Sequence, residues 1–361
     1  MKFFVRKRES ESDGTDSLTI PPMSDEPPKK KKKYPPFWRK KHRRSTRAGE
    51  HQPVMLAEVL AALDPKPGQI LVDCTLGFAG HSLELLKAVA PDGLLIACDL
   101  DPANLDPARE KLDALGGLFS LHHANFAGLA QLLAAEGAEG VDGLLADLGM
   151  SSMQVDDRGR GFSFMRDGPL DMRMDPTRGR TAADFLNTLP VEELATCFRD
   201  LGDEPQADRI AEAIVARRQT TPFERSKDFR ELIEVAAPVV LDRMPGAATE
   251  RKQKLAPIAR VFQALRIHVN RELANLQQLL RMLPHLLKPG GTAAIVGFHS
   301  GEDRLIKAAF RDGLRSGTYE AISGDPIRPA LEERRANPRS RSAKLRWARR
   351  TSLPFKPEVP S

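Results

Sequence analysis

Short apolar runs alternate with helical patterns over the hundred residues that follow position 50. Apolar side chains spaced three and four residues apart predict a helix over 54–63. Apolar runs bounded by glycine or acidic residues predict strands, and a helical pattern lies between each pair of strands. Four strands that alternate with helices are typical of an α/β fold, in which helices cover both faces of a parallel sheet. The strands are predicted within 65–77, 93–101, 119–126 and 141–149.

The alternation stops at the fourth strand. A polar segment with several glycines follows over 147–175, and amphipathic patterns then predict helices up to residue 257. A long helical pattern over 258–287 precedes a fifth buried strand within 288–298. The helices are therefore inserted at the carboxyl edge of the sheet, where open α/β sheets bind ligands. The predicted domains are a disordered basic tail (1–50), a core domain (51–155 and 258–350), an inserted helical substrate-recognition domain (156–257) and a flexible end (351–361).

The formal net charge of +6 is unevenly distributed along the chain. Residues 1–50 carry 15 Lys and Arg against 7 Asp and Glu, with the basic side chains gathered in Lys29–Lys33 and Trp38–Arg44. Such a segment has too few apolar residues to form a core. It is either a non-specific anchor on nucleic-acid phosphates or a solvated tail without a partner, and a nuclear address is a weaker third interpretation. A second basic cluster, Arg328–Arg350, lies within the predicted folded part.

Composition argues against several classes of protein. Cys74, Cys98 and Cys197 show no paired spacing, so we predict neither a disulfide framework nor a metal site, and a reducing cytoplasm as the location. No run of 18 apolar residues occurs, which argues against a membrane span. The N-terminus lacks the apolar core of a signal peptide.

Candidate chemistry lies where neighbouring predicted strands end. Gly77 and Gly80 allow a tight turn before a helix whose first N–H groups are free. Asp99 ends the second strand, where a carboxylate can accept hydrogen bonds from the hydroxyls of a ribose. The dinucleotide fingerprint G-x-G-x-x-G is absent, which favours S-adenosylmethionine, a nucleoside cofactor without phosphate. Asp147 ends the fourth strand beside the expected sulfonium, and Phe126 either stacks on the adenine or belongs to the core.

Six motifs together resemble the bacterial RsmH (MraW) family, and the resemblance covers 51–350. It implies a class I S-adenosylmethionine-dependent methyltransferase, with a Rossmann-like doubly wound sheet, that methylates N4 of one cytosine in the decoding centre of 16S ribosomal RNA. The expected partner is 16S ribosomal RNA or the small ribosomal subunit; we expect a monomer or weak homodimer that does not bind membranes. The motifs are HQPVM (51–55), DCTLGFAGHS (73–82), DLGMSSMQVDDRGRGFSFMRDGPLDMRMDP (147–176), FQALRIHVNREL (262–273), GFHSGEDR (297–304) and NPRSRSAKLR (337–346).

The resemblance also implies a set of cofactor contacts, two of which, His81 and Gln154, the pattern of strands does not single out. The chain departs from the family at three of the nearby positions, where Phe78 replaces a common arginine, Ala79 a glycine and Gly301 a leucine. A contact through the backbone N–H of Ala79 is expected to survive the change if φ is negative there. The implied cofactor contacts are Ala79, Gly80, His81, Asp99, Phe126, Asp147 and Gln154.

Methyl transfer to an exocyclic amine calls for an acceptor that hydrogen-bonds the amine. DNA amino methyltransferases usually place [DNS]-P-P-[YFW] after the fourth strand, whereas this chain has DLGMSS. Asp147 is therefore the candidate acceptor, with Ser151 and Ser152 in support. His299 is predicted to lie either on a loop beside the target base or in a structural network at a helix N-terminus. A Ser/His hydrolase is disfavoured because no nucleophile elbow precedes Ser300.

The target base must leave its stack to reach such a pocket, so we expect phosphate contacts and a stacking ring around it. We expect about half of the arginines in 147–175 to pair instead with neighbouring acids. Two alternatives to the enzyme stay open: a non-catalytic RNA-binding assembly factor on a degenerate fold, and a DNA amino methyltransferase, which the missing proline pair disfavours. The candidate RNA contacts are Arg158, Arg160, Phe162, Phe164, Arg166, Arg173, Arg304, Arg339 and Arg341.

Overall fold

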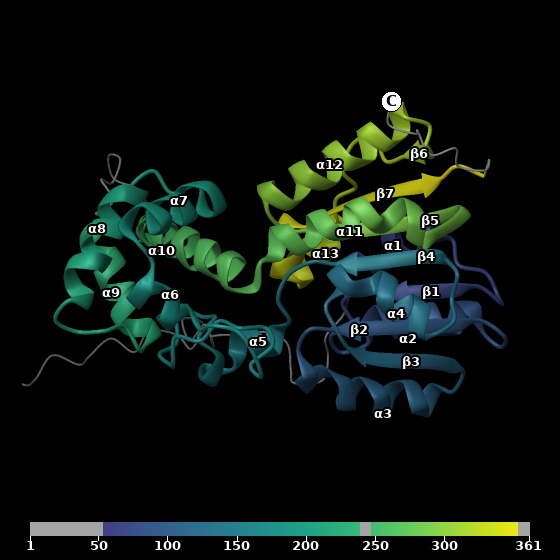
Figure 1. The fold of residues 1–361 in the computed structure, drawn as a ribbon, viewed down its shortest axis with the longest axis horizontal. Coiled ribbons are helices and arrows are strands. Elements are labelled where there is room, and N and C mark those ends of the chain that lie inside the picture. Colours follow the sequence, from purple (N-terminus) through teal and green to yellow (C-terminus); the bar gives the residue numbers. More distant parts are fainter. Residues whose placement is uncertain (1–52, 239–246, 353–361) are drawn as a thin grey trace, which may run out of the picture. The chain divides into compact units, whose positions relative to one another are not determined.

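The strands of the computed structural model form one mixed sheet in the order β3-β2-β1-β4-β5-β7-β6 (Figure 1). The structure describes residues 53–238 and 247–352, so the predicted basic tail and most of the predicted flexible end lie outside the described residues. The first five strands are parallel to one another, and β7 runs antiparallel to both β5 and β6. The strands are β1 (Ile70–Asp73), β2 (Leu94–Asp99), β3 (Leu118–His123), β4 (Val141–Asp147), β5 (Leu287–Gly297), β6 (Tyr319–Ile322) and β7 (Lys344–Arg350).

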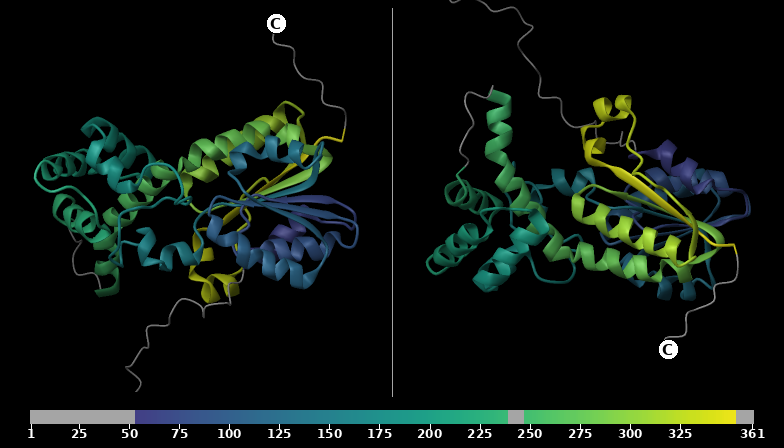
Figure 2. Two further views of the ribbon diagram at one scale, coloured as in Figure 1. Left: turned by 60° about the horizontal axis from the view of Figure 1, so that its bottom comes forward. Right: turned by 90° about the horizontal axis from the view of Figure 1, so that it is seen from above.

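Successive residues of each central strand point to opposite faces of the sheet, and helices cover both faces (Figure 2). Leu71 and Leu95 pack with α1, α2 and α3 on one face. Val72 and Ile96 pack with α4, α11 and α12 on the other face. This arrangement confirms the predicted doubly wound α/β fold. The six helices are α1 (Leu56–Leu63), α2 (Gly80–Val89), α3 (Leu105–Leu115), α4 (Leu129–Ala135), α11 (Glu272–Leu286) and α12 (Ser300–Arg315).

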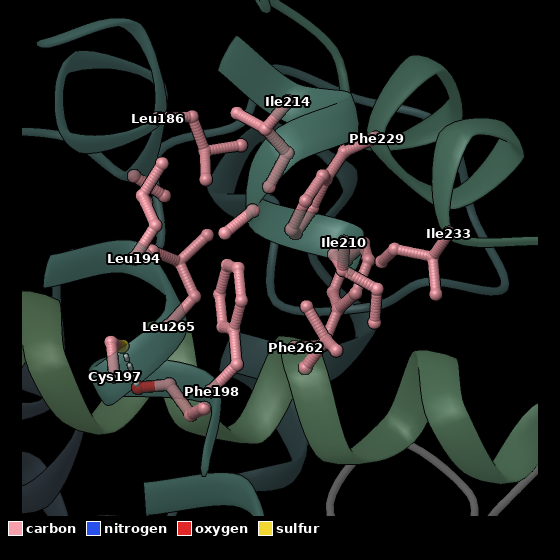
Figure 3. Close-up of a cluster of buried hydrophobic side chains, with 14 of the residues drawn as sticks. Leu186, Leu194, Cys197, Phe198, Ile210, Ile214, Phe229, Ile233, Phe262 and Leu265 are labelled. Atoms are coloured by element: carbon pink, nitrogen blue, oxygen red, sulfur yellow. Dashed lines mark hydrogen bonds between the residues drawn. The ribbon is translucent and has the colours of Figure 1, made fainter. Parts of the chain in front are cut away.

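The helices that follow β4 have a hydrophobic core of their own (Figure 3). Phe229 lies at its centre, with its ring centroid 5.2 Å from that of Phe262 and 5.9 Å from that of Phe223. Helices were predicted for this part of the chain, and helices are found there. The exact bounds of the inserted domain stay a prediction. The elements are α5 (Ser152–Asp156), α6 (Ala182–Thr188), α7 (Val191–Gly202), α8 (Ala207–Arg218), α9 (Ser226–Ala236) and α10 (Ala247–Asn270).

The long helix predicted over 258–287 is divided into α10 and α11. Arg271, between them, has φ of 52°, a left-handed conformation that ends one helix before the next begins. The side chain of Asn270 explains where the division falls, because it accepts a hydrogen bond from the backbone N–H of Met174 and donates to the carbonyl of Met172. The end of α10 is thus tied to the polar segment 147–175.

The last part of the chain also differs from the prediction. Residues 337–347 resemble the final strand of the family named above, but the first of them form the short helix η5 (Pro338–Ser342), capped by the side chain of Asn337. The final strand, β7, begins only at Lys344. A short helix, α13 (Leu331–Ala336), precedes this turn, and β6 had not been predicted. Proline and the Asx cap favour a turn over an extended strand at this point.

Candidate active site

The loop between β1 and α2 is held by carboxylates on either side of it. Asp73, at the end of β1, accepts hydrogen bonds from the Ser82 hydroxyl at 2.6 Å and from the Thr75 backbone N–H at 3.0 Å. The N–H of Gly77 donates to Oδ2 of Asp99 at 2.8 Å, which joins the loop to the end of β2. Gly77 has φ of 48°, and a Cβ on Gly80 would lie only 3.2 Å from the Cβ of Pro53. The left-handed backbone therefore favours glycine at position 77, and close packing of the Pro53 ring favours it at position 80.

Ala79 does not meet the condition under which its N–H was expected to contact the cofactor. Its φ is +61°, and its N–H already donates to the carbonyl of Leu76 at 2.8 Å. An alanine in the left-handed region costs roughly 1 kcal/mol relative to a right-handed one. Glycine adopts this conformation without the cost, which explains why the family named above usually has glycine at this position. The methyl group of Ala79 is fully buried in the core beneath the loop.

Asp99 has the surroundings expected of a ribose acceptor. Its Oδ2 accepts from Gly77, and its Oδ1 accepts from the backbone N–H of Asp101 at 2.8 Å. Burial raises the pKa of Asp99 to about 6, although the hydrogen bonds from Asp101 and Gly77 oppose the rise. Each oxygen has further lone-pair capacity, so the carboxylate can still accept two hydroxyl groups.

Asp147, at the end of β4, faces His81 of α2. The Nδ1 atom of His81 lies 3.8 Å from Oδ2 of Asp147, and its Nε2 lies 3.0 Å from the carbonyl oxygen of Val54. The other carboxylate oxygen, Oδ1, is buried and has no hydrogen-bond partner among the described residues. The backbone N–H of Asp147 donates to the Thr75 hydroxyl at 2.7 Å, so β4 is also tied to the β1 loop.

Negative charge dominates the surroundings of Asp147. Burial, as the largest effect, raises the pKa of Asp147 to about 6; His81 opposes the rise, and Asp73, Glu302 and Glu333 add to it. A buried carboxylate oxygen without a partner, in a group of acids, suits a positively charged ligand. The sulfonium of S-adenosylmethionine has that charge. Asp147 therefore fits the sulfonium of the cofactor, and Asp99 fits its ribose.

Gln154 is buried beside this site, but within a network that the sequence did not reveal. Its amide completes a capping box with Ser151 at the start of α5, in which each side chain bonds the other's backbone N–H. Its Nε2 also donates to Oδ2 of Asp101 at 2.9 Å, an oxygen that Arg160 contacts at the same distance. Asp101 is thus a residue beside the candidate site that sequence reasoning missed. The acid two positions after Asp99 was the available signal.

Two other predicted site residues are placed less fully. Phe126, in the short helix η3 (Phe126–Gly128), is half-buried and packs against the core face formed with α4, α11 and α12. Its ring therefore belongs at least partly to the core, the second of the two interpretations. The side chain of Ser152 lies outside the described residues, so its supporting role stays a prediction.

Most of the arginines in 147–175 pair with acids. Arg166 pairs with Asp156 at 2.8 Å, and Arg173 makes a two-pronged contact with Asp171. Arg160 contacts Asp101 and the carbonyls of Arg173 and Met174. Because these partners already engage Arg160 and Arg173 in half-buried places, both serve mainly to hold the segment together.

Arg158 differs from the other three arginines of the segment, because it is exposed and makes no ion pair within the described ranges. It therefore stays a candidate for a phosphate contact. The proportion of paired arginines is higher than the half that was expected.

The aromatic rings of the segment belong to the helical core. Phe162 is only 6% exposed, and Arg160 lies over its ring at 5.7 Å. Phe164 packs edge-on against Phe262 with centroids 5.7 Å apart. Phe162 is therefore not the stacking platform that was predicted, because no base can reach its face without opening the core.

His299 begins α12 rather than standing free on a loop. Its Nδ1 caps the helix by accepting from the N–H of Glu302, and its Nε2 lies 3.0 Å from Oε1 of Glu302, although not in the direction of a good hydrogen bond. Burial opposes ionisation of Glu302, but the attraction of His299 at ion-pair distance and the hydrogen bond from the Phe298 N–H leave its pKa lowered overall. Of the two interpretations, the structural network at a helix N-terminus describes the contacts of His299.

Glu272, on α11, completes this network. Its ligand atom lies within 4.8 Å of those of His299 and Glu302, a spacing that a cation could use. However, Arg266 contacts both oxygens of Glu272 at 2.8 and 2.9 Å and already supplies the positive charge. The Arg266–Glu272 pair therefore joins α10 to α11 beside His299 and Glu302 at the start of α12.

The remaining basic candidates lie on α12 and in the turn before β7. Arg304 is exposed, and Arg341 is exposed with its Nε bonded to the carbonyl of Arg334 at 3.2 Å. Arg339 is half-buried, and its guanidinium has no hydrogen bond or ion pair with any described residue. Burial lowers the pKa of Arg339, against the attraction of Asp156. An unpaired, partly desolvated guanidinium is a favourable partner for a phosphate.

The sheet order, the glycine loop after β1 and the carboxylates at the ends of β2 and β4 define a class I methyltransferase that uses S-adenosylmethionine. A family model described as the MraW methylase family matches residues 48–351. The chain belongs to this family.

No helix in the described part of the chain is long and apolar enough to cross a membrane.

Curated relatives agree with the family model. A protein of Geobacter sp. (strain M21), named ribosomal RNA small subunit methyltransferase H, is 43% identical over 311 residues, which cover 82% of this chain and 97% of the relative. The protein of that name from Geobacter sulfurreducens (strain ATCC 51573 / DSM 12127 / PCA) is 44% identical over 313 residues, covering 82% and 98%. Among solved structures, a putative rRNA-methylase from Clostridium thermocellum matches with a TM-score of 0.40 at 10% identity, over 84% of this chain and 99% of that one.

Proposed function

We propose that this methyltransferase modifies N4 of a cytosine in the decoding centre of 16S ribosomal RNA, in the cytoplasm. The observation that carries the proposal is the Oδ1 atom of Asp147, which is buried, lacks a partner among the described residues and lies in a group of acids. The names of the relatives support ribosomal RNA of the small subunit as the substrate. The substrate can be free 16S RNA or the assembled small subunit under this proposal. We still expect the protein to be a monomer or a weak homodimer.

The chemistry assigns separate tasks to the two carboxylates. S-adenosylmethionine supplies a methyl group on a positively charged sulfur. The new N4–carbon bond forms as the sulfur–carbon bond breaks with its electron pair left on sulfur, and the amine releases one proton. Asp99 holds the ribose, so the methyl group has a fixed position. Asp147 accepts a hydrogen bond from the amine, and this bond directs the nitrogen lone pair at the methyl carbon. The Asp147 carboxylate then receives the amine proton, which passes on to solvent.

The basic residues that lack protein partners are the ones we propose for the RNA. Arg158, Arg304 and Arg339 belong to three separate elements, η4 (Arg158–Arg160), α12 and η5. Exposed or unpaired guanidinium groups bind phosphates through two parallel hydrogen bonds. Arg341 adds a fourth charge near Arg339 in the sequence. Arg160 and Arg173 are not included, because their guanidinium groups already hold the polar segment.

The test is mass spectrometry of 16S ribosomal RNA from cells that lack the gene, with and without complementation. Wild-type protein is expected to restore the N4 methyl group, and Asp147→Asn is expected not to restore it. Asp113→Asn, on the exposed side of α3, is the matched control and should restore it. A decoding-centre cytosine that keeps its N4 methyl group in cells without the gene would refute the proposal.

Calorimetry with S-adenosylmethionine separates the enzyme from a non-catalytic assembly factor. The enzyme is expected to bind the cofactor, because Asp99 and Asp147 are both present at the strand ends. Absence of binding would favour the assembly factor.

A further inference from the structure

The orientation of the His81 ring is set from outside the methyl-transfer site. Its Nε2 lies 3.0 Å from the carbonyl oxygen of Val54. A carbonyl oxygen only accepts hydrogen bonds, so Nε2 must carry a proton. In the neutral ring Nδ1 then carries the lone pair, and in the imidazolium it carries a second proton. This nitrogen is the one that faces Asp147, and the residue is only 6% exposed.

The two carboxylate oxygens of Asp147 have different surroundings. Oδ2 lies 3.8 Å from Nδ1 of His81, within the range of an ion pair. Oδ1 is buried and lacks a hydrogen-bond partner in the described residues. The main-chain N–H of Asp147 is already bonded to Thr75, so the peptide group beneath the carboxylate is fixed. Oδ2 is therefore the oxygen that faces His81, and Oδ1 is enclosed without a hydrogen-bond donor among the described residues.

His81 is the basic group among those that act on Asp147. Asp73 of β1, Glu302 of α12 and Glu333 of α13 all repel a negative charge there, and His81 of α2 attracts it. Glu333 is held in place because its Oε1 accepts from the backbone N–H of Met55. Without the imidazole, three acids on three elements would oppose the ionised form of Asp147.

We propose that His81 is a positioning residue for methyl transfer, which as the imidazolium holds Oδ2 of Asp147 and keeps the carboxylate ionised so that it can accept the N4–H of the target cytosine. This inference rests on the proposed function, in which Asp147 is the acceptor. It assigns the His81 side chain a task that differs from contact with the cofactor. The imidazole forms no covalent bond in the reaction.

The experiment compares pH–rate profiles of wild type and His81→Gln. The substrate is small ribosomal subunits from cells that lack the gene, with saturating radiolabelled S-adenosylmethionine. Glutamine retains an N–H for the carbonyl of Val54 but cannot carry charge. His122→Gln is the matched control, because His122 on β3 also faces a carboxylate, that of Glu136 at 3.0 Å, but away from Asp147. We expect the acidic limb of the kcat profile to move to higher pH by roughly one unit in His81→Gln, because loss of a neighbouring positive charge raises the pKa of Asp147 by about that amount.

Cofactor binding gives the second readout. At pH 8 the Kd for S-adenosylmethionine is expected to stay within about threefold of wild type, because the proposal assigns the His81 side chain to Asp147 and not to the cofactor. A limb that stays in place overturns the inference, whether or not the Kd changes, because His81 would then serve only the cofactor or the fold. Wild-type enzyme that fails to methylate the subunits would instead overturn the proposed function.

A measurement on the wild-type protein covers the case in which His81→Gln does not fold. Nitrogen chemical shifts of the His81 ring distinguish the two neutral tautomers. Protons on both ring nitrogens near pH 6 are the expected result. A ring that is neutral there overturns the inference, because protonation on Nε2 alone turns the Nδ1 lone pair toward Asp147 and protonation on Nδ1 alone cannot bond to the carbonyl of Val54.

Discussion

The side-chain nitrogen Nε2 of Gln154 lies 2.9 Å from Oδ2 of Asp101, and both side chains are buried. Arg160 reaches the same oxygen from farther along the segment. A second tie lies at the other end of the segment, where Asp175 faces His123 at the end of β3 at 3.3 Å. A polar segment without helical or strand periodicity is thus held against the strand ends by charged contacts, in addition to the apolar packing of its rings in the helical core.

The first prediction concerns the stability of this arrangement. Asp101→Ala is expected to lower the free energy of unfolding by about 3 kcal/mol, because it leaves the half-buried charge of Arg160 without its partner. Urea unfolding at pH 8 measures the change. Asp64→Ala removes an exposed ion pair with Lys66 and should cost less than about 1 kcal/mol. Equal losses in the two variants would show that the Asp101 network does not stabilise the fold.

The second prediction concerns the acceptor. Asp147→Asn is expected to lower kcat by about 100-fold or more, the usual contribution of a positioned acceptor, and to leave the thermal midpoint nearly unchanged. In the wild type, the raised pKa of Asp147, about 6, means that activity is lost as pH falls through this value, because the carboxylate becomes protonated. Single-turnover rates between pH 5 and 8 test both statements. A variant with more than a tenth of the wild-type rate would exclude Asp147 as the acceptor.

The third prediction concerns Asp99 and the cofactor. Above a pH of about 6 its carboxylate is ionised and accepts the ribose hydroxyls; below that value it is protonated and loses part of this capacity. The affinity for S-adenosylmethionine should therefore weaken as pH falls through 6. Asp99→Asn should bind S-adenosylmethionine about tenfold more weakly at pH 8, because a tenfold change corresponds to the free energy of about one hydrogen bond to a charged group. Its Kd should also lose the pH dependence near 6, and calorimetry that shows the same dependence in both proteins would count against the assignment.

The fourth prediction concerns Arg339. Arg339→Gln should weaken binding to 16S ribosomal RNA and reduce the slope of log Kd against log salt by about one, as expected for one lost phosphate contact. The fold should be unaffected, because the guanidinium bonds to no described residue. Fluorescence anisotropy at several salt concentrations gives the slope. Arg315→Gln, on α12, is the control, since Arg315 is exposed and paired with Asp312. An unchanged slope would remove Arg339 from the interface.

Local patterns in the chain were enough to establish the sheet, its parallel strands and the helices after β4. Periodicity of two or 3.6 residues reports which side of a strand or helix is apolar, and this depends on near neighbours alone. The same reasoning placed Asp73, Asp99 and Asp147 at strand ends, because parallel strands end at one edge. It did not find β6, which is four residues long, or the break at Arg271, which depends on the distant contact of Asn270 with Met172 and Met174.

Contacts between distant positions established the rest. Arg160 and Arg158 stand two residues apart in one motif, yet one is held by Asp101, 59 positions away, and the other is exposed. Phe162 has an aromatic ring that could stack on a base, but packing in the helical core buries that ring. The ring of His81 is turned by Val54 so that Nδ1 faces Asp147. Burial and partner choice set charge and availability, and both arise only once segments far apart in the chain are brought together.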